Sequence, residues 1–151
     1  VWKELVFRSR FYSGKIEEKQ GVAVPRNEMF SLGGARNLRG YDVEDIGPKE
    51  SALNADGDLE EFNVGAPFTV FTTLEFEHPL AKEAGLKFVT FFDAGTATKI
   101  DDLNKIYMDY GFGFRWFSPI GVLRFEWGVP INPDPDMNAG TKFHFDIGQL
   151  F

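Results

Sequence analysis

The side chains in this sequence that could most clearly do chemistry are charged groups that lie next to glycines and aromatic residues. Arg39 is followed by Gly40 and Tyr41, so a rigid five-donor guanidinium group stands on a backbone that can bend sharply. A buried guanidinium requires an acidic partner, because an unpaired charge is costly away from water. The strand pattern described below turns Glu75 and Asp93 to one inward face. These residues therefore indicate ion pairing in an enclosed interior, with Arg39 as the donor.

No arrangement typical of an enzyme or of a metal centre is present. The serine residues lack a histidine and aspartate context, and the two histidines, His78 and His144, are far apart in the sequence. Cysteine is absent, so thiolate ligands and disulfides are excluded. The segment Gly111-Phe112-Gly113 is not followed by a helix start, so it does not predict a phosphate-binding loop. We expect no catalytic residue, no metal and no cofactor.

Composition narrows the class of protein further. A formal charge of −7 argues against nucleic acid as a partner, since phosphate binding needs a basic surface. No segment approaches the roughly 18 uncharged apolar residues of a membrane-spanning helix. A membrane β-barrel is still allowed, because half of each barrel strand faces a polar interior. No secretory signal opens the sequence at Val1-Trp2-Lys3-Glu4, so an outer-membrane assignment implies the C-terminal portion of a longer protein.

The elements that must position these charges are β-strands separated by turns. We predict strands at residues 3–16, 67–78, 85–95, 106–117, 120–130 and 139–151. Their lengths lie near the roughly nine to eleven residues that a tilted strand needs to cross a bilayer. Residues 17–66 are rich in Gly, Asn, Asp and Pro and predict a long irregular loop. The tight Ser118-Pro119 turn contrasts with longer polar connections, as in outer-membrane barrels.

Alternation along the strands separates an apolar face from a polar one. In the segment 106–117, one face holds Met108, Tyr110, Phe112, Phe114 and Trp116, and the other holds Asp109, Gly111, Gly113 and Arg115. A lipid-facing sheet produces this two-residue repeat. A soluble β-sandwich would give the same repeat with the apolar face inward, and it stays open as an alternative. Arg124 and Glu126 in the next strand predict a solvated inner surface.

The terminal segment has its own pattern. Phe143, Phe145 and Ile147 share one face, and the chain ends on Phe151. A strand that ends on an aromatic residue in this way resembles the terminal signal of bacterial outer-membrane β-barrels. Gly148 near the end is expected to weaken pairing or to allow a kink.

A longer set of motifs carries a more specific resemblance. The loop contains, in this order, Gly33-Gly34, Leu38-Arg39-Gly40-Tyr41 and Gly47-Pro48. It resembles the signature loop of the superfamily that unites BamA-like insertases with two-partner-secretion translocators. The segments 91–95, 113–121 and 145–151 match later motifs of that superfamily in the expected order. The four matches cover most of the chain from Phe30 onward, although each alone is a weak pattern.

The resemblance implies an all-β fold, an antiparallel transmembrane β-barrel with a long loop inserted into its lumen. Residues 1–151 would supply about the last six of sixteen strands, in a bacterial outer membrane. In the family the loop arginine pairs with acidic groups on two strands, which here match Glu75 and Asp93. Gly33 and Gly34 would let the chain turn inward, and Tyr41 would pack beside the arginine.

The function implied by the resemblance is non-enzymatic assembly of outer-membrane proteins. A weak seam beside the last strand would template incoming strands, so the partners would be membrane lipid and nascent outer-membrane β-barrel proteins. Accessory lipoproteins would bind domains outside this chain. The alternatives are a two-partner-secretion pore that exports an unfolded polypeptide and a soluble β-sandwich binding module.

Overall fold

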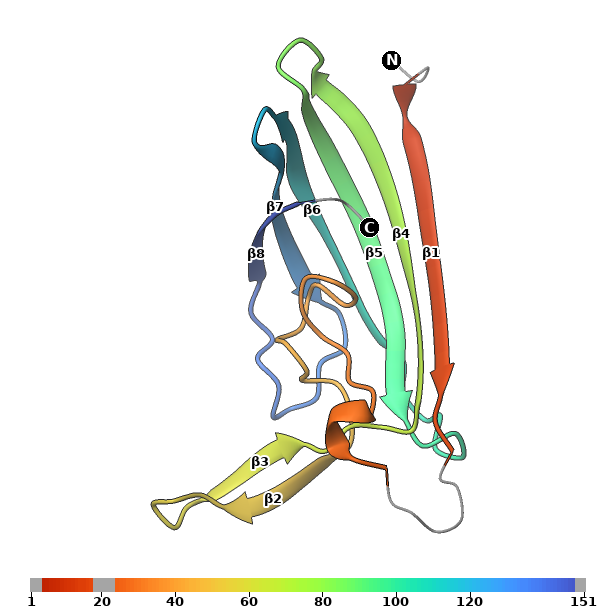
Figure 1. The fold of residues 1–151 in the computed structure, drawn as a ribbon, viewed down its shortest axis with the longest axis vertical. Coiled ribbons are helices and arrows are strands. Elements are labelled where there is room, and N and C mark those ends of the chain that lie inside the picture. The colour runs from red at the N-terminus through yellow and green to blue at the C-terminus, as the bar shows by residue number, and fades with distance from the viewer. Residues whose placement is uncertain (1–3, 18–23, 149–151) are drawn as a thin grey trace.

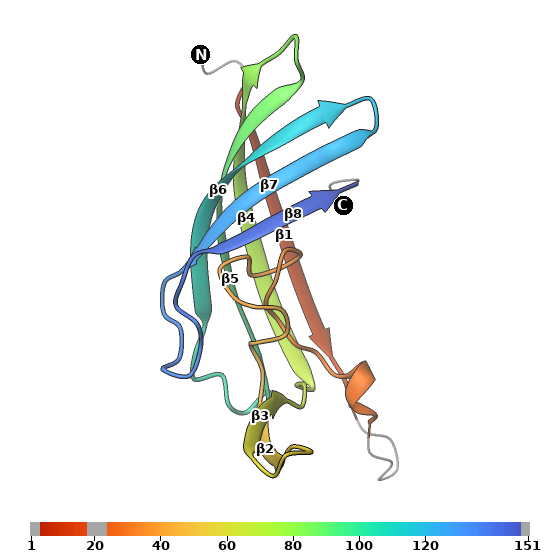
Figure 2. The same ribbon diagram turned by 90° about the vertical axis from the view of Figure 1, so that its left-hand side faces the viewer.

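One curved antiparallel sheet dominates the computed structural model, which describes residues 4–17 and 24–148. Its strands are β1 (Val6–Lys15), β4 (Phe68–Ala81), β5 (Leu86–Thr98), β6 (Tyr107–Ser118), β7 (Gly121–Pro130) and β8 (Lys142–Ile147). They pair in the order β1-β4-β5-β6-β7-β8, and Figure 1 shows them as a tall, twisted layer. We call this layer the main sheet. Figure 2 shows β6, β7 and β8 bending around so that the layer has a concave face.

The prediction of an all-β, antiparallel fold is confirmed. Each of the six predicted strands is present, with ends that differ by a few residues from the predicted ones. The largest difference is at the last strand, which was predicted over 139–151 and spans Lys142–Ile147. Gly148 follows as a bend with a φ of 158°. Phe151, the expected terminal signal, lies outside the described residues.

The region 17–66 differs from the prediction of one irregular loop. It contains a separate two-stranded hairpin, β2 (Lys49–Leu53) and β3 (Leu59–Asn63), and a single 3-10 turn, η2 (Arg26–Glu28). The hairpin closes at Asn54, whose side-chain oxygen accepts hydrogen bonds from the backbone N–H groups of Asp56 and Asp58. Both strands have five residues, and neither alternates between apolar and polar residues. The two-residue repeat that revealed the other strands is therefore missing here.

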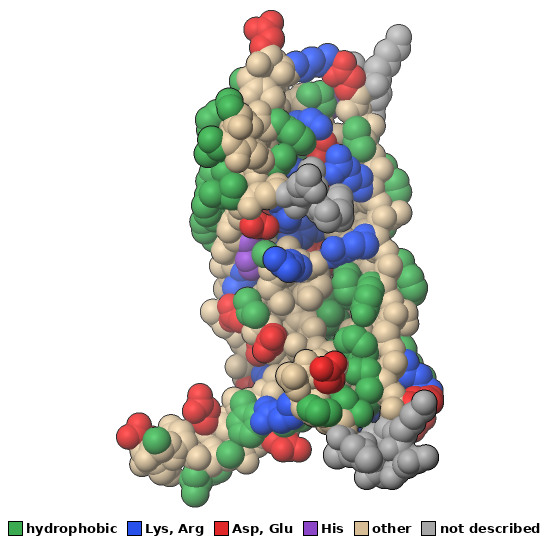
Figure 3. All heavy atoms as spheres, in the orientation of Figure 1, with side chains coloured by type: hydrophobic (Ala, Val, Ile, Leu, Met, Phe, Trp, Pro, Cys, Tyr) green, Lys and Arg blue, Asp and Glu red, His purple; other side chains and the backbone are tan. Residues whose placement is uncertain are grey.

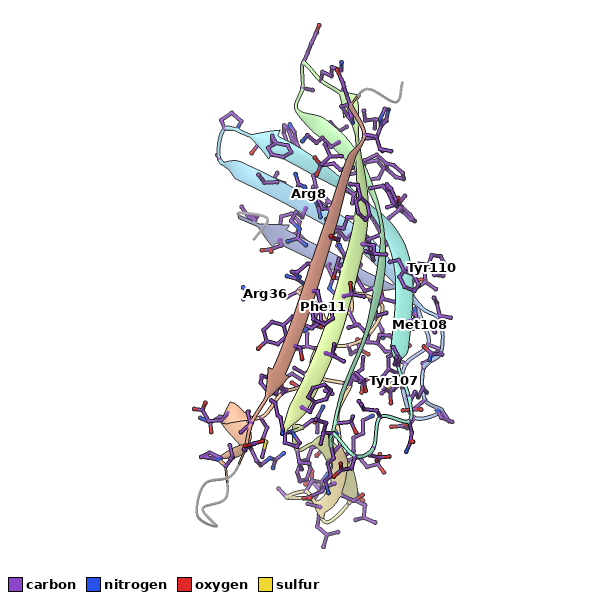
Figure 4. All side chains as sticks on the ribbon, turned by 90° about the vertical axis from the view of Figure 1, so that its right-hand side faces the viewer. Arg8, Phe11, Arg36, Tyr107, Met108 and Tyr110 are labelled. Atoms are coloured by element: carbon purple, nitrogen blue, oxygen red, sulfur yellow. The ribbon has the colours of Figure 1, made fainter. Side chains whose placement is uncertain are left out.

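Strand alternation divides the main sheet into a charged concave face and an aromatic convex face. On β6, Asp109 and Arg115 are buried, whereas Tyr110, Phe112 and Trp116 are exposed. Tyr110 projects from the convex side and Arg36 lies on the opposite side (Figure 4). The convex aromatic rings contact one another across strands: Phe112 and Trp127 lie 5.4 Å apart, and Trp127 and Phe143 lie 5.0 Å apart. Such pairs stabilise neighbouring strands by about 0.5–1.5 kcal/mol each.

The hydrophobic core lies between the main sheet and the long loop. Its buried members are Leu32, Leu38, Tyr41, Ile46, Ala66, Ala97 and Met137, with Phe71 and Tyr107 packed against them. Four of these residues belong to the segment 32–46, so the loop itself forms the second layer over part of the concave face. No second sheet of comparable size packs there in the described part of the chain. The arrangement therefore differs from that of a β-sandwich.

Over residues 4–17 and 24–148 we find no α-helix that is long and apolar enough to span a membrane.

Candidate functional site

Residues 33–47, which we call the inner loop, fold back onto the concave face of the main sheet. Figure 1 shows this segment lying in front of the strands. Its base closes where Leu32 and Ile46 exchange two backbone hydrogen bonds of 2.9 Å. Gly33 has a φ of 116°, and a Cβ there would lie 2.0 Å from the carbonyl oxygen of Asp42. Only glycine fits at this position, where the chain turns back toward the sheet.

Arg39 at the tip of the inner loop is enclosed by acidic groups from three strands, β4, β5 and β7. Its Nε and Nη2 each donate to the carboxylate of Asp93 on β5 at 2.8 Å. Its Nη1 donates to Glu75 on β4 at 2.6 Å, and the guanidinium carbon lies 3.5 Å from the centre of the Phe91 ring. Paired charged hydrogen bonds and a ring contact fix the position of a guanidinium more tightly than a single charge would.

Arg39 stays positively charged although it is buried. Its exposed fraction is 3%, and burial by itself would lower the pKa of the guanidinium. The hydrogen bond and the negative charge of Asp93 outweigh that effect, so the pKa of Arg39 lies above its ordinary value. The inner loop therefore carries a permanent positive charge against the sheet.

A second arginine, which the sequence analysis did not identify as a site residue, completes the cluster. Arg115 on β6 lies 2.9 Å from Glu75, 3.1 Å from Glu77 and 3.2 Å from Glu126. We call Arg39, Arg115, Glu75, Glu77, Asp93 and Glu126 the charge cluster. Figure 3 shows basic and acidic side chains in the middle of the concave face, with hydrophobic ones along its flanks.

One prediction about this face was wrong. Arg124 and Glu126 were expected on a solvated inner surface, but the exposed fraction of Glu126 is 1%. Glu126 accepts a hydrogen bond from Arg124 at 2.9 Å and lies 3.4 Å from Arg39. The inner loop covers this part of β7, and its return over the sheet could not be read from the strand pattern.

Two glycines let the backbone of the inner loop touch the strands. A Cβ on Gly128 of β7 would lie 2.4 Å from the carbonyl oxygen of Arg39. A Cβ on Gly40 would lie 2.4 Å from the Cβ atom of Asp109 on β6 and 2.9 Å from the backbone nitrogen of Pro130 on β7. The Tyr41 hydroxyl donates to the carbonyl of Met108 at 3.0 Å, and burial raises its pKa to about 12. Tyr41 packs edge-on against Tyr107, and it therefore anchors the loop to β6.

The remaining predicted site residues lie in the core, in the turns of the loop and on β8. Leu38 is fully buried in the core and Gly34 donates its N–H to the carbonyls of Leu38 and Tyr41 at 3.1 Å. Gly47 and Pro48 lie at the base of the β2–β3 hairpin, where the Pro48 carbonyl accepts from Val64 at 2.8 Å. Phe143, Phe145 and Ile147 are exposed on the convex face of β8. The structure thus brings Arg39 of the loop motif together with Glu75 and Asp93, and it keeps Phe143, Phe145 and Ile147 on the opposite face.

Ion pairs at one end of the sheet connect the surrounding loops. Lys49 lies 2.6 Å from Asp136 and 3.2 Å from Asp45, and Asp134 accepts from Lys105 and from Tyr107. Burial of the Asp134 carboxyl opposes ionisation, but the hydrogen bonds from Lys105 and Tyr107 outweigh it and hold its pKa below the ordinary value. These contacts hold the segment 131–141 beside the hairpin.

The lowered pKa of Asp134 predicts a pH dependence of stability. A carboxyl whose pKa is depressed by folding stabilises the folded state above its unfolded pKa of about 3.9, and this contribution is lost as the pH falls through the folded value. We expect Asp134→Asn to lower the free energy of unfolding above pH 5 by less than about 1 kcal/mol, since the group is partly exposed. Thermal unfolding of the full-length protein should show this difference shrinking below pH 4. A difference that stays constant from pH 6 to pH 3 would contradict the assignment.

Comparison with known proteins places these features in context. Residues 2–151 match the family model described as the Omp85 superfamily domain. A protein of Nitratidesulfovibrio vulgaris named "Outer membrane protein assembly factor BamA" is 31% identical over 152 residues, which cover 97% of this chain and 18% of that protein. The protein of the same name from Neisseria meningitidis serogroup B is 23% identical, over 85% of this chain and 19% of that protein.

A solved structure shares the fold. The crystal structure of BamA from Haemophilus ducreyi lacking POTRA domains 1-3 matches with a TM-score of 0.81 and 23% identity, covering 94% of this chain and 31% of that chain. The present chain spans less than a third of that structure, and less than a fifth of the length of the two relatives above.

Proposed function

The chain belongs to the Omp85 superfamily, and from this premise we propose that it forms the C-terminal part of the barrel of an outer-membrane protein assembly factor. As a member of this superfamily it is an outer-membrane protein. In the proposal its main sheet supplies the last six strands of a sixteen-stranded barrel. The convex face would contact membrane lipid and the concave face would line the lumen. The aromatic convex surface and the charged concave surface support this orientation.

The observation that carries the proposal is the attachment of Arg39. Its two hydrogen bonds to Asp93 and its contact with Glu75 fasten the inner loop to two adjacent strands. We propose that this attachment fixes the interior of the barrel and sets how readily the barrel opens. A buried ion pair of this kind specifies one arrangement more than it adds stability, because the desolvation of the charges offsets much of their attraction.

The proposed work is non-covalent and takes place at the last strand. β8 is the shortest strand of the main sheet, with six residues, and it pairs with β7 alone among the described strands. A free strand edge offers N–H and C=O groups to an incoming strand. We propose that nascent outer-membrane β-barrel proteins add a strand at this edge. Accessory lipoproteins would act through parts of the longer protein.

Depletion of the full-length protein in its own bacterium tests the proposal. We expect several unrelated outer-membrane β-barrel proteins to lose their folded, heat-modifiable forms, because each requires the same assembly step. Complementation with the wild-type gene should restore them. Normal assembly of these proteins, combined with the failed secretion of one large exported polypeptide, would instead identify a two-partner-secretion translocator.

A further inference from the structure

The inner loop contacts the last strand as well as the strands that hold Arg39. Lys142 at the start of β8 lies 2.6 Å from the Asp42 carboxylate. Two residues later, Nε2 of His144 lies 2.7 Å from the carbonyl oxygen of Arg39. Both side chains point to the concave face, as the alternation along β8 requires. The loop and β8 are therefore joined directly, over a sequence separation of about one hundred residues.

Arg39 contacts both the strands that hold the inner loop and the last strand. Its side chain binds β4 and β5 through Glu75 and Asp93, and its carbonyl accepts the bond from His144 on β8. A carbonyl oxygen can only accept, so the Nε2 of His144 carries the hydrogen. Gly128 of β7 lies directly against this carbonyl, so the peptide group after Arg39 has little room to turn away from β8.

The contacts are confined to the first half of β8. Lys142 has an exposed fraction of 7%, whereas the side chain of its partner Asp42 is more than half exposed. Asp146, the next residue on the same face after His144, lies 3.7 Å from Arg124 and is half exposed. No hydrogen bond or ion pair joins Asp146 to the described residues of the inner loop. Among the described residues, the loop thus binds the start of β8, whereas Asp146 near the end of β8 pairs with Arg124 of β7.

We propose that the inner loop and β8 form one coupled unit, in which Lys142 and His144 are positioning residues that tie the free edge of the last strand to Arg39. This coupling rests on the proposed function, because it concerns the regulation of the β8 edge at which incoming strands would add. Movement of β8 away from β7 would break the contacts with Asp42 and with the Arg39 carbonyl. By linkage, release of the loop would loosen β8 by the same factor.

Hydrogen exchange of the full-length protein in lipid nanodiscs tests this coupling. The first variant is Asp42→Asn, which removes the carboxylate charge that pairs with Lys142. The second is His144→Ala, which removes the imidazole that donates to the Arg39 carbonyl. We expect backbone amides of residues 143–147 to exchange roughly three- to tenfold faster in each variant, the effect of losing one hydrogen bond or one partly exposed ion pair. Amides of the inner loop, residues 33–47, should accelerate by a similar factor.

Matched variants make the result specific. His144→Gln keeps an N–H donor and should restore most of the wild-type protection in both segments. Asp146→Asn changes the same face of the same strand and should leave residues 33–47 unaffected. Unchanged exchange in both Asp42→Asn and His144→Ala would overturn the proposal, as would faster exchange in β8 without any change in the loop. Because exchange is read without an assembly assay, failure of the proposed function would appear separately, in the depletion experiment.

Discussion

Replacing Arg39 with alanine is expected to release the inner loop and to cause a large loss of stability. The substitution leaves Asp93 and Glu75 buried, with Arg115 as the remaining arginine for Glu75. Removing one partner from a buried ion pair costs about 3–5 kcal/mol, because the other charge stays desolvated. Thermal unfolding of the full-length protein in detergent should show this decrease.

Two related variants sharpen the test of Arg39. Arg39→Lys keeps the charge but loses the bidentate hydrogen bonding to Asp93, so we expect a loss of stability smaller than that of Arg39→Ala. Arg36→Ala removes an exposed arginine from the same loop, and a change within about 0.5 kcal/mol is expected, as for most surface substitutions. Equal effects of Arg36→Ala and Arg39→Ala would contradict the account, because they would mean that the charge cluster does not hold the loop.

Gly128→Ala is expected to displace the inner loop without removing any charge. The added Cβ would lie 2.4 Å from the Arg39 carbonyl oxygen and 2.8 Å from the Gly40 nitrogen. Both contacts are with backbone, which cannot rotate aside as a flexible side chain can. Overpacking of this kind costs about 1–3 kcal/mol, and here it also separates Arg39 from Asp93. Limited proteolysis of the full-length protein should show faster cleavage within residues 33–47.

Gly140→Ala is the matched control for that experiment. A Cβ at Gly140 would meet the side-chain oxygen of Asn138 at 3.0 Å, and this amide can rotate away. We expect wild-type cleavage rates. Because Gly128→Ala and Arg39→Ala disturb the same contact, the double variant should be less affected than the sum of the single ones. Additive losses would show that the two positions act independently.

The strands and the facing of the two acidic residues could be predicted from the sequence because both follow from a local rule. Side chains alternate across a strand, so Glu75 and Asp93 take inward positions once their strands are recognised. The six strands were recognisable because aromatic residues mark one face almost without interruption, as in Met108 to Trp116. A membrane sheet with one lipid face makes this pattern unusually clear.

Other features depend on contacts that no local pattern encodes. The alternation along β6 predicts that Arg115 faces inward, but its three carboxylate contacts require β4, β5, β6 and β7 to pair in this order and in the observed register. The bond from His144 to the Arg39 carbonyl joins segments about one hundred residues apart. The β2–β3 hairpin was missed because its short strands carry charged residues on both faces. Glu126 is buried because the inner loop folds over β7, and the strand pattern does not encode that contact.

The charge cluster and the hydrophobic core attach the inner loop to the concave face in different ways. Pairing between Arg39 and two carboxylates is strongly directional, whereas the small hydrophobic core under Leu38 and Tyr41 is not. The loop is therefore placed by hydrogen-bond geometry and held by packing. A change that preserves packing but alters the geometry, such as Arg39→Lys, separates these two contributions.

A double-mutant cycle between Arg39 and Asp93 tests the central claim most directly. The free energy of unfolding of the full-length protein is measured for the wild type, Arg39→Met, Asp93→Asn and the double variant. If their pairing fixes the inner loop, the double variant will be no less stable than the worse single variant, with a coupling energy of at least about 1.5 kcal/mol. Losses that simply add, with a coupling energy near zero, would contradict the account.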